Sequence, residues 1–225
     1  MSTRRKGDLM DDGDGAWSRE YALKGRLWGG NPYCLPPVLR ERSVVLDLGC
    51  GDGRAVPGMT GRGWSVLALD SSPQAIRLAR AVDTTHQAMC ILGNAEQLPF
   101  RNEVFDAIFA AHLAGHLTES GRAALGRELL RVLLPGGCVY FRDFAVGDFR
   151  GGRGVQVEPG TWLRKNSIAT HYFTEQEVTA LFAPLNPVTL QTSEWEIRVR
   201  GNSLPRREIE GVFRKEEFRS ENPDS

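Results

Sequence analysis

Five short apolar segments, separated by stretches with helical character, lie between residues 43 and 144 and constrain the fold more than any other feature. Each segment is nearly all apolar and rich in β-branched or aromatic residues, which is typical of strands buried on both faces. Strands that alternate with helices favour a doubly wound, mostly parallel sheet with helices on both of its faces. The predicted strands are SVVLDLG (43–49), WSVLALD (64–70), AMCILGN (88–94), FDAIFAAHL (105–113) and CVYFRDF (138–144).

The C-terminal part of the chain predicts one more helix and two more strands. In THYFTEQEVTALFAPL (170–185), Thr174 and Glu177 have the spacing of a helix capping box. The segments EWEIRVR (194–200) and REIEGVFRK (207–215) are separated by a turn and are expected to form an antiparallel pair at the sheet edge. The predicted fold is therefore α/β and Rossmann-like, a seven-stranded mostly parallel sheet with an antiparallel last strand.

The composition gives expectations about the number of domains, the binding partners and the cellular location. The 225 residues fit one sizeable domain, and equal numbers of basic and acidic residues give a formal net charge of zero. That balance gives no global signal for nucleic acid or membrane binding. The four cysteines are far apart and form no CxxC pair, which favours reduced thiols and a cytoplasmic location. No apolar leader or membrane span is expected.

The loop after the first strand carries the clearest binding signal. In VLDLGCGDGR (45–54) the acidic and glycine positions follow the spacing D-x-G-x-G-x-G, and Arg54 occupies the position where a dinucleotide-binding fingerprint needs glycine. Asp47 would repel a pyrophosphate but suits a cationic, amino-acid-bearing ligand. Asp70 ends the second strand, where an acidic side chain accepts hydrogen bonds from ribose hydroxyls.

These residues resemble the class I S-adenosylmethionine (SAM) methyltransferase family. Val45–Gly53 corresponds to the family's first motif, Asp70 to its ribose acid, and Asn94-Ala95 to its adenine-side motif, although the family often has Asp in place of Asn94. A tight turn without a ligand and an NAD site are the alternatives, and Asp47 together with Asp70 favours SAM. The resemblance implies SAM as the cofactor, with these expected contacts in the sheet domain: Asp47, Gly49, Cys50, Gly51, Gly53, Asp70, Ser71, Asn94, Ala95 and Ala111.

Three regions follow from this interpretation. Residues 1–15 are expected to be a mobile tail, 16–42 a helical lead or lid, and 43–225 the SAM-binding methyltransferase domain, with an acceptor-side insertion at about 144–172. The sequence of this lead predicts a helix that starts at Trp17 and breaks at Gly29-Gly30. Within it, Arg26 could reach the cofactor's carboxylate and Trp28 could cover the pocket, or the helix could simply pack on the sheet.

Methyl transfer needs an acceptor held in line with the methyl carbon, and a general base only when the nucleophile carries a proton. The acceptor is expected over the ends of the fourth and fifth strands. His112 follows the fourth strand and is a candidate for lining this pocket, with an ordinary loop role as the alternative. His112 and His116 lie four residues apart, but no third ligand is near, so no metal is expected.

The stretch YFRDFAVGDFRGGRG (140–154) marks the edge of the fifth strand. Its FRD element, the later Asp148, RKN (164–166), HYFT (171–174) and VFRK (212–215) are similar in order to the eukaryotic tRNA cytidine-N3 methyltransferases. That resemblance implies that Arg142, Asp143 and Asp148 face a cytosine, and that the acceptor is a tRNA whose phosphates meet nearby basic residues: Arg142, Arg150, Arg153, Arg164 and Lys165.

Other acceptors and roles stay open at this point. A protein side chain or a small metabolite would use the same cofactor half, and a non-catalytic SAM-binding subunit that activates another methyltransferase is a further alternative. A protein partner or a homodimer is compatible with each. Arg142 and Asp143 could also pair with each other and pin the loop.

Overall fold

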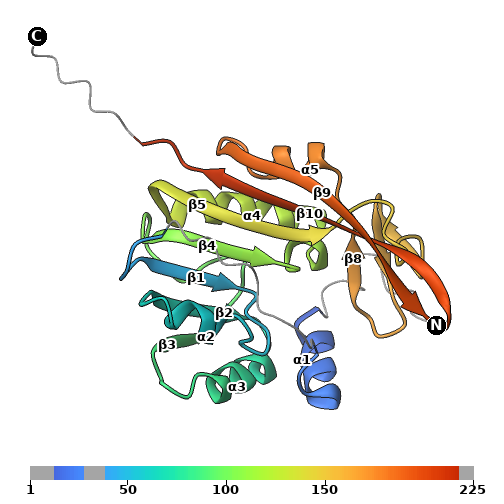
Figure 1. Ribbon diagram of the computed structural model, residues 1–225, viewed down its shortest axis with the longest axis horizontal. Helices are drawn as coiled ribbons and strands as arrows, with labels where there is room; N and C mark the ends of the chain where they lie inside the picture. The colour runs from blue at the N-terminus through green and yellow to red at the C-terminus, as the bar shows by residue number, and fades with distance from the viewer. Residues whose placement is uncertain (1–12, 28–38, 218–225) are drawn as a thin grey trace, which may run out of the picture.

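The computed structural model describes residues 13–27 and 39–217, with the side chains of residues 13 and 14 left out. Its centre is a seven-stranded sheet in the order β3-β2-β1-β4-β5-β10-β9 (Figure 1). The five strands from β3 to β5 are parallel, and β10 pairs antiparallel with both β5 and β9, which confirms the predicted fold class. The strands are β1 (Val44–Leu48), β2 (Ser65–Asp70), β3 (Ala88–Leu92), β4 (Phe105–Ala111), β5 (Leu133–Phe144), β9 (Asn186–Val199) and β10 (Asn202–Arg214).

Helices cover both faces of the sheet because side chains alternate along each strand. Leu46 and Leu48 of β1 pack in the cluster that contains α4 (Glu119–Val132) and α5 (Glu175–Leu181). Val45 lies on the other face, with residues from α2 (Val56–Thr60). The helix α3 (Pro73–Val82) packs beside β2 and β3 on that same side.

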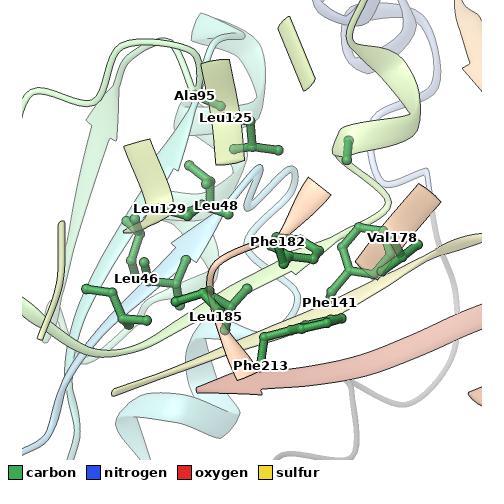
Figure 2. Close-up of a cluster of buried hydrophobic side chains, with 14 of the residues drawn as sticks. Leu46, Leu48, Ala95, Leu125, Leu129, Phe141, Val178, Phe182, Leu185 and Phe213 are labelled. Atoms are coloured by element: carbon green, nitrogen blue, oxygen red, sulfur yellow. The ribbon is translucent and has the colours of Figure 1, made fainter. Parts of the chain in front are cut away.

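Figure 2 shows the larger core, where aromatic rings join the late strands to α5. The Phe182 ring centroid lies 4.7 Å from that of Phe213 on β10 and 5.1 Å from that of Phe141 on β5. Leu129 of α4 is fully buried in the same cluster. The antiparallel β10 strand is therefore held by a continuous apolar core as well as by its backbone pairing.

Side-chain caps start α3 and α5. Ser72 is the N-cap of α3, and its hydroxyl accepts a hydrogen bond from the Ala75 N–H at 3.2 Å. Thr174 and Glu177 form the complete capping box of α5. Each cap satisfies backbone donors that the first helical turn leaves without partners.

Several boundaries differ from the predictions. β5 begins at Leu133 rather than Cys138, so Pro135–Gly137 lies inside the strand, next to a register shift against β4. β9 and β10 extend well beyond the segments predicted for them, because their long antiparallel pairing continues to the turn at Gly201. Long-range pairing of this kind stabilises residues that lack strand periodicity.

The insertion after β5 contains a second sheet that the sequence did not predict. Its three antiparallel strands are β6 (Val155–Glu158), β7 (Thr161–Leu163) and β8 (Ala169–His171). It is attached to the main sheet where the Phe173 N–H donates to the Phe144 carbonyl at 2.9 Å. Runs of three or four residues are too short to show a hydrophobic period.

The N-terminal helix α1 spans Gly13–Lys24, so it begins before Trp17 and ends before the predicted break. Gly25 adopts a φ of 64° and its N–H donates to the Tyr21 carbonyl, which ends the helix. Gly29 and Gly30, like Trp28 and Cys34, lie outside the described residues. None of the helices in the described ranges has the length and apolar character that crossing a membrane requires.

Candidate active site

The loop that follows β1 is shaped by three glycines in the left-handed region, Gly49, Gly51 and Gly53, with φ values of 73°, 55° and 76°. The N–H groups of Gly49 and Cys50 donate to the Leu69 carbonyl at 2.8 and 3.0 Å. A Cβ on Gly53 would lie 2.6 Å from the Ala79 Cα of α3. The loop therefore needs glycine both for its backbone angles and for its close approach to the neighbouring helix.

Asp70 connects this loop to the start of α3. Its carboxylate accepts from the Gly51 N–H at 2.9 Å and from the Ser72 N–H at 2.9 Å. Ser71 lies between these contacts and is half-buried at the end of β2. The acidic residue predicted to meet the ribose thus also fixes the shape of the glycine loop.

Asp47 is an almost fully buried carboxyl group at the end of β1. Its Oδ2 atom has no hydrogen-bond partner in the described part of the chain. Burial, followed by the nearby Asp70 charge, raises the pKa of Asp47 to about 7. A cationic amino group placed here would supply the missing partner and favour the ionised form. The residue types therefore fit the amino-acid end of SAM.

The helix α1 lies over the glycine loop. The Tyr21 hydroxyl would be only 2.5 Å from a Cβ on Gly51, and the Ser18 and Ser72 hydroxyls are 2.9 Å apart. On its other side α1 meets the acceptor-side insertion, where Asn166 Nδ2 donates to Glu20 Oε1 at 3.0 Å. The lead covers the loop through Tyr21 and Ser18, while the predicted contact Arg26 is exposed.

The adenine-side segment follows β3. The Asn94 Oδ1 atom accepts from the Glu96 N–H at 2.8 Å, and Ala95 is buried beneath this turn. Ala111 ends β4 and pairs in register with Arg142 of β5. These residues lie at the carboxyl ends of parallel strands of the same sheet, the edge where open α/β sheets bind ligands.

His112 stands at the boundary between the cofactor loop and the acceptor side. The backbone N–H of His112 donates to the Arg142 carbonyl at 2.7 Å, and the φ of His112 is 53°. The Nε2 atom lies 3.6 Å from Glu208 Oε1, and the ring lies 4.6 Å from the Phe144 ring. Burial, followed by the charge of Arg142, lowers the pKa of His112 to about 3, so the imidazole is neutral at pH 7.

Arg142 and Asp143 do not pair with each other. They are adjacent on a strand, so their side chains leave opposite faces. Arg142 forms ion pairs with Glu208 and Glu210 of β10. Asp143 is fully buried and accepts from the Gly115 N–H at 2.8 Å, and burial raises its pKa to about 7.

Asp148 is likewise engaged inside the protein. Its Oδ2 atom lies 3.1 Å from Arg206 Nη1 and accepts from the Arg207 N–H at 3.1 Å. Sequence reasoning did not identify the β10 residues Arg206 and Glu208 in this region. Their place beside the end of β5 is set by the antiparallel register, in which Glu208 pairs with Phe144.

Comparison with known proteins agrees with this geometry. A family described as a methyltransferase domain matches residues 46–141, and a relative called an uncharacterized methyltransferase is 36% identical over 67% of this chain. Residues 46–141 therefore match the methyltransferase family, and the fold around them is that of the class I SAM-dependent methyltransferases.

Two sequence relatives illustrate the range of similarity. The uncharacterized methyltransferase is a protein of Mycobacterium tuberculosis, and its 169 matched residues make up 66% of its length. The malonyl-[acyl-carrier protein] O-methyltransferase of Halorhodospira halophila is 33% identical over 138 residues, 60% of this chain and 46% of the relative. The chain thus spans less than two thirds of the length of these relatives.

Two solved structures share the fold. A SAM-dependent methyltransferase of Methanosarcina mazei has a TM-score of 0.67 at 24% identity and covers 82% of this chain and 100% of its own. A chain of the Haloferax volcanii complex that contains the Trm112 methyltransferase activator has a TM-score of 0.65 at 19% identity, covering 96% of this chain and 100% of its own.

The glycine loop generates a direct test. Gly51→Ala would combine a strained φ with a clash against the Tyr21 hydroxyl, so we expect SAM affinity to fall about tenfold or more by calorimetry. Gly201→Ala is the matched control, because Gly201 has a φ of 83° but no described atom within 4 Å of the place that a Cβ would occupy. Equal SAM affinity of the wild type and the Gly51→Ala protein would contradict this role of the loop.

Asp47 generates a pH-dependent test. Its folded pKa of about 7 lies above the ordinary value, so the folded state keeps a proton that the unfolded state has released. The stability of the cofactor-free protein should therefore fall as the pH rises from the ordinary carboxyl pKa to about 7, and stay level above it. Asp47→Asn should reduce this slope, leaving the contribution of Asp143, and should raise the free energy of unfolding at pH 8 by about 1–3 kcal/mol.

The same substitution should weaken SAM binding, because the amide carries no charge for the amino group. Asp83→Asn is the control of opposite sign, since hydrogen bonds from the Ala88 N–H and the Thr85 hydroxyl accompany a lowered Asp83 pKa. Asp83→Asn should therefore destabilise the protein at pH 8. Denaturant unfolding curves across pH measure the stability change of both variants. An Asp47→Asn protein that is less stable than the wild type at pH 8 would refute the raised pKa assigned to Asp47.

Proposed function

We propose that the chain methylates an oxygen atom of a small-molecule acceptor bound at the carboxyl ends of β4 and β5. The observation that carries the proposal is His112, a half-buried neutral imidazole next to the glycine loop and beside the carboxylate of Glu208. SAM, when bound, supplies a methyl group on a positively charged sulfur. The remaining chemistry concerns how this chain binds, orients and deprotonates the acceptor.

The geometry of the cofactor half supports the following cofactor contacts. Asp47 would hold the amino group, Asp70 the ribose hydroxyls, and the turn at Asn94-Ala95 the adenine. The left-handed glycines leave room for the ligand against the backbone. The helix α1, placed over the loop by Tyr21, would exclude water from this side.

A hydroxyl acceptor must lose its proton as its oxygen forms the new bond to carbon. The neutral imidazole of His112 carries a lone pair on one ring nitrogen, which can take that proton. The Glu208 carboxylate, 3.6 Å from Nε2, would offset part of the cost that burial and the Arg142 charge impose on the imidazolium that results. Asp143 is a positioning residue in this scheme, since it holds Gly115 three residues after His112.

The same contacts rank the tRNA cytidine acceptor second. Asp143 and Asp148, the carboxylates expected at the cytosine amine, both bind groups of the protein. Cytosine N3 also carries no proton and would make no use of His112. The O-methyltransferase name of the Halorhodospira halophila relative supports an oxygen acceptor for this chain. A non-catalytic partner subunit remains the alternative that a lack of turnover would favour.

Labelled SAM incubated with separate pools of tRNA, protein and small molecules tests the proposal. We expect label in the small-molecule pool. His112→Ala should lower kcat about a hundredfold or more, because it removes the proton acceptor, with SAM affinity changed less than about twofold.

The matched control is His86→Ala, since His86 is exposed and has nearly the same backbone angle, a φ of 52°. It should leave kcat unchanged. Label confined to tRNA, or full activity of the His112→Ala protein, would overturn the proposal.

A further inference from the structure

Four arginines gather beyond the proposed transfer site, and we call Arg150, Arg153, Arg164 and Arg206 the arginine cluster. Three of them surround the Phe149 ring. The distance from the guanidinium carbon to the centre of that ring is 5.4 Å for Arg150, 5.2 Å for Arg153 and 5.7 Å for Arg206. Arg164 joins them through its Nη2, which donates to the Tyr172 hydroxyl at 2.9 Å. The loop after β5, the insertion and β10 thus bring four positive charges to one place.

Most of this charge has no partner of opposite sign in the described part of the chain. Arg206, whose side chain is 8% exposed, pairs with Asp148 at 3.1 Å and approaches Glu208 at 3.5 Å. The other three have no carboxylate within ion-pair distance among residues 13–27 and 39–217. Burial, followed by the charges of Arg206 and Arg164, lowers the pKa of Arg150, as expected for crowded cations.

Two buried donors, one on β7 and one on the residue after it, also lack acceptors among the described residues. Trp162 Nε1 and Arg164 Nε are buried and donate to no atom there. Trp162 and Arg164 are two residues apart along the extended chain at the end of β7, so their side chains leave the same face of the small sheet. A Cβ on Gly152 would lie 3.9 Å from Trp162 Nε1, which places the loop that carries Arg150 and Arg153 alongside these donors. Buried donors without partners are costly, so an acceptor group is expected to meet them.

One aromatic ring connects the cluster to the transfer site. The Phe144 ring lies 4.6 Å from the His112 ring, and the guanidinium carbons of Arg206 and Arg150 lie 4.6 and 5.8 Å from the same ring. A molecule whose hydroxyl meets His112 can therefore extend past Phe144 to the arginines.

We propose that the arginine cluster binds an oxyanion, a phosphate or carboxylate group carried by the acceptor, and so selects anionic acceptors. The inference rests on the proposed oxygen methylation. Guanidinium groups present several N–H donors in a planar fork that matches both kinds of oxyanion. The cluster is compact, with Arg206 buried, Arg150 and Arg164 half-buried and Arg153 exposed, which suits one anionic group better than the successive phosphates of a nucleic acid strand.

Titration calorimetry with inorganic phosphate and, separately, with acetate at constant ionic strength tests the subsite. We expect saturable binding of at least one of the two, and the stronger ligand identifies the oxyanion. Arg150→Gln and Arg164→Gln should each weaken it about tenfold, because each removes a charge-assisted contact. Arg101→Gln is the control, since Arg101 is exposed and outside the cluster, and it should change nothing.

Folding of each variant is checked by its SAM affinity, which should equal that of the wild type. Arg164→Lys keeps the charge but lacks the Nε donor, and it should bind phosphate more weakly than the wild type. Binding that Arg150→Gln and Arg164→Gln leave intact, or no binding of either anion at millimolar concentrations, would overturn the subsite.

The outcomes separate this inference from the proposed function. With an acceptor from the small-molecule pool, Arg150→Gln should raise KM about tenfold and change kcat less than about twofold. An unchanged KM would refute the subsite and leave the methylation intact. Arginine-dependent phosphate binding by a protein that labels only tRNA would refute the small-molecule acceptor and leave the subsite intact.

Discussion

The two hydrogen bonds accepted by Asp70 are the contacts on which the rest of the cofactor site depends. The Asp70 carboxylate ties the Gly51 N–H of the loop to the Ser72 N–H at the start of α3. Because Ser72 also caps α3, the end of β2, the glycine loop and the helix are fixed relative to one another. The position of Asp47 and the place where α1 covers the loop both follow from that arrangement. A charged acceptor of two backbone donors is a strong local constraint.

The acceptor side depends on the pairing of β10 with β5. Antiparallel register brings Glu208 and Glu210 beside Arg142, and Arg206 beside Asp148. Buried charges are costly unless they are paired, and carboxylates balance the charges of both Arg142 and Arg206 here. The balance fails farther out, where three arginines have no described carboxylate partner. Under the proposed function, this difference would separate a proton-transfer position at His112 from an anion-binding position at the arginine cluster.

Local sequence patterns predicted the strands and the glycine loop of the cofactor half well, because their determinants lie close together in the chain. Asp47, the three glycines and Asp70 occupy a single strand–loop–helix–strand unit, so periodicity and spacing place them correctly. The acceptor side could not be predicted in the same way. Glu208 meets the end of β5 only through sheet register, and no local pattern records a pairing between residues so distant in sequence. The alternation rule for strands could have excluded an Arg142–Asp143 pair, since neighbours on a strand point to opposite faces.

Calorimetric titration of SAM into the wild-type protein and the Asp70→Ala protein tests the central claim most directly. The account predicts one SAM bound per wild-type chain and no measurable binding once the carboxylate that fixes the loop is removed. Absence of binding to the wild type at millimolar SAM would contradict the cofactor assignment. Equal binding by the Asp70→Ala protein would contradict the role given to that carboxylate.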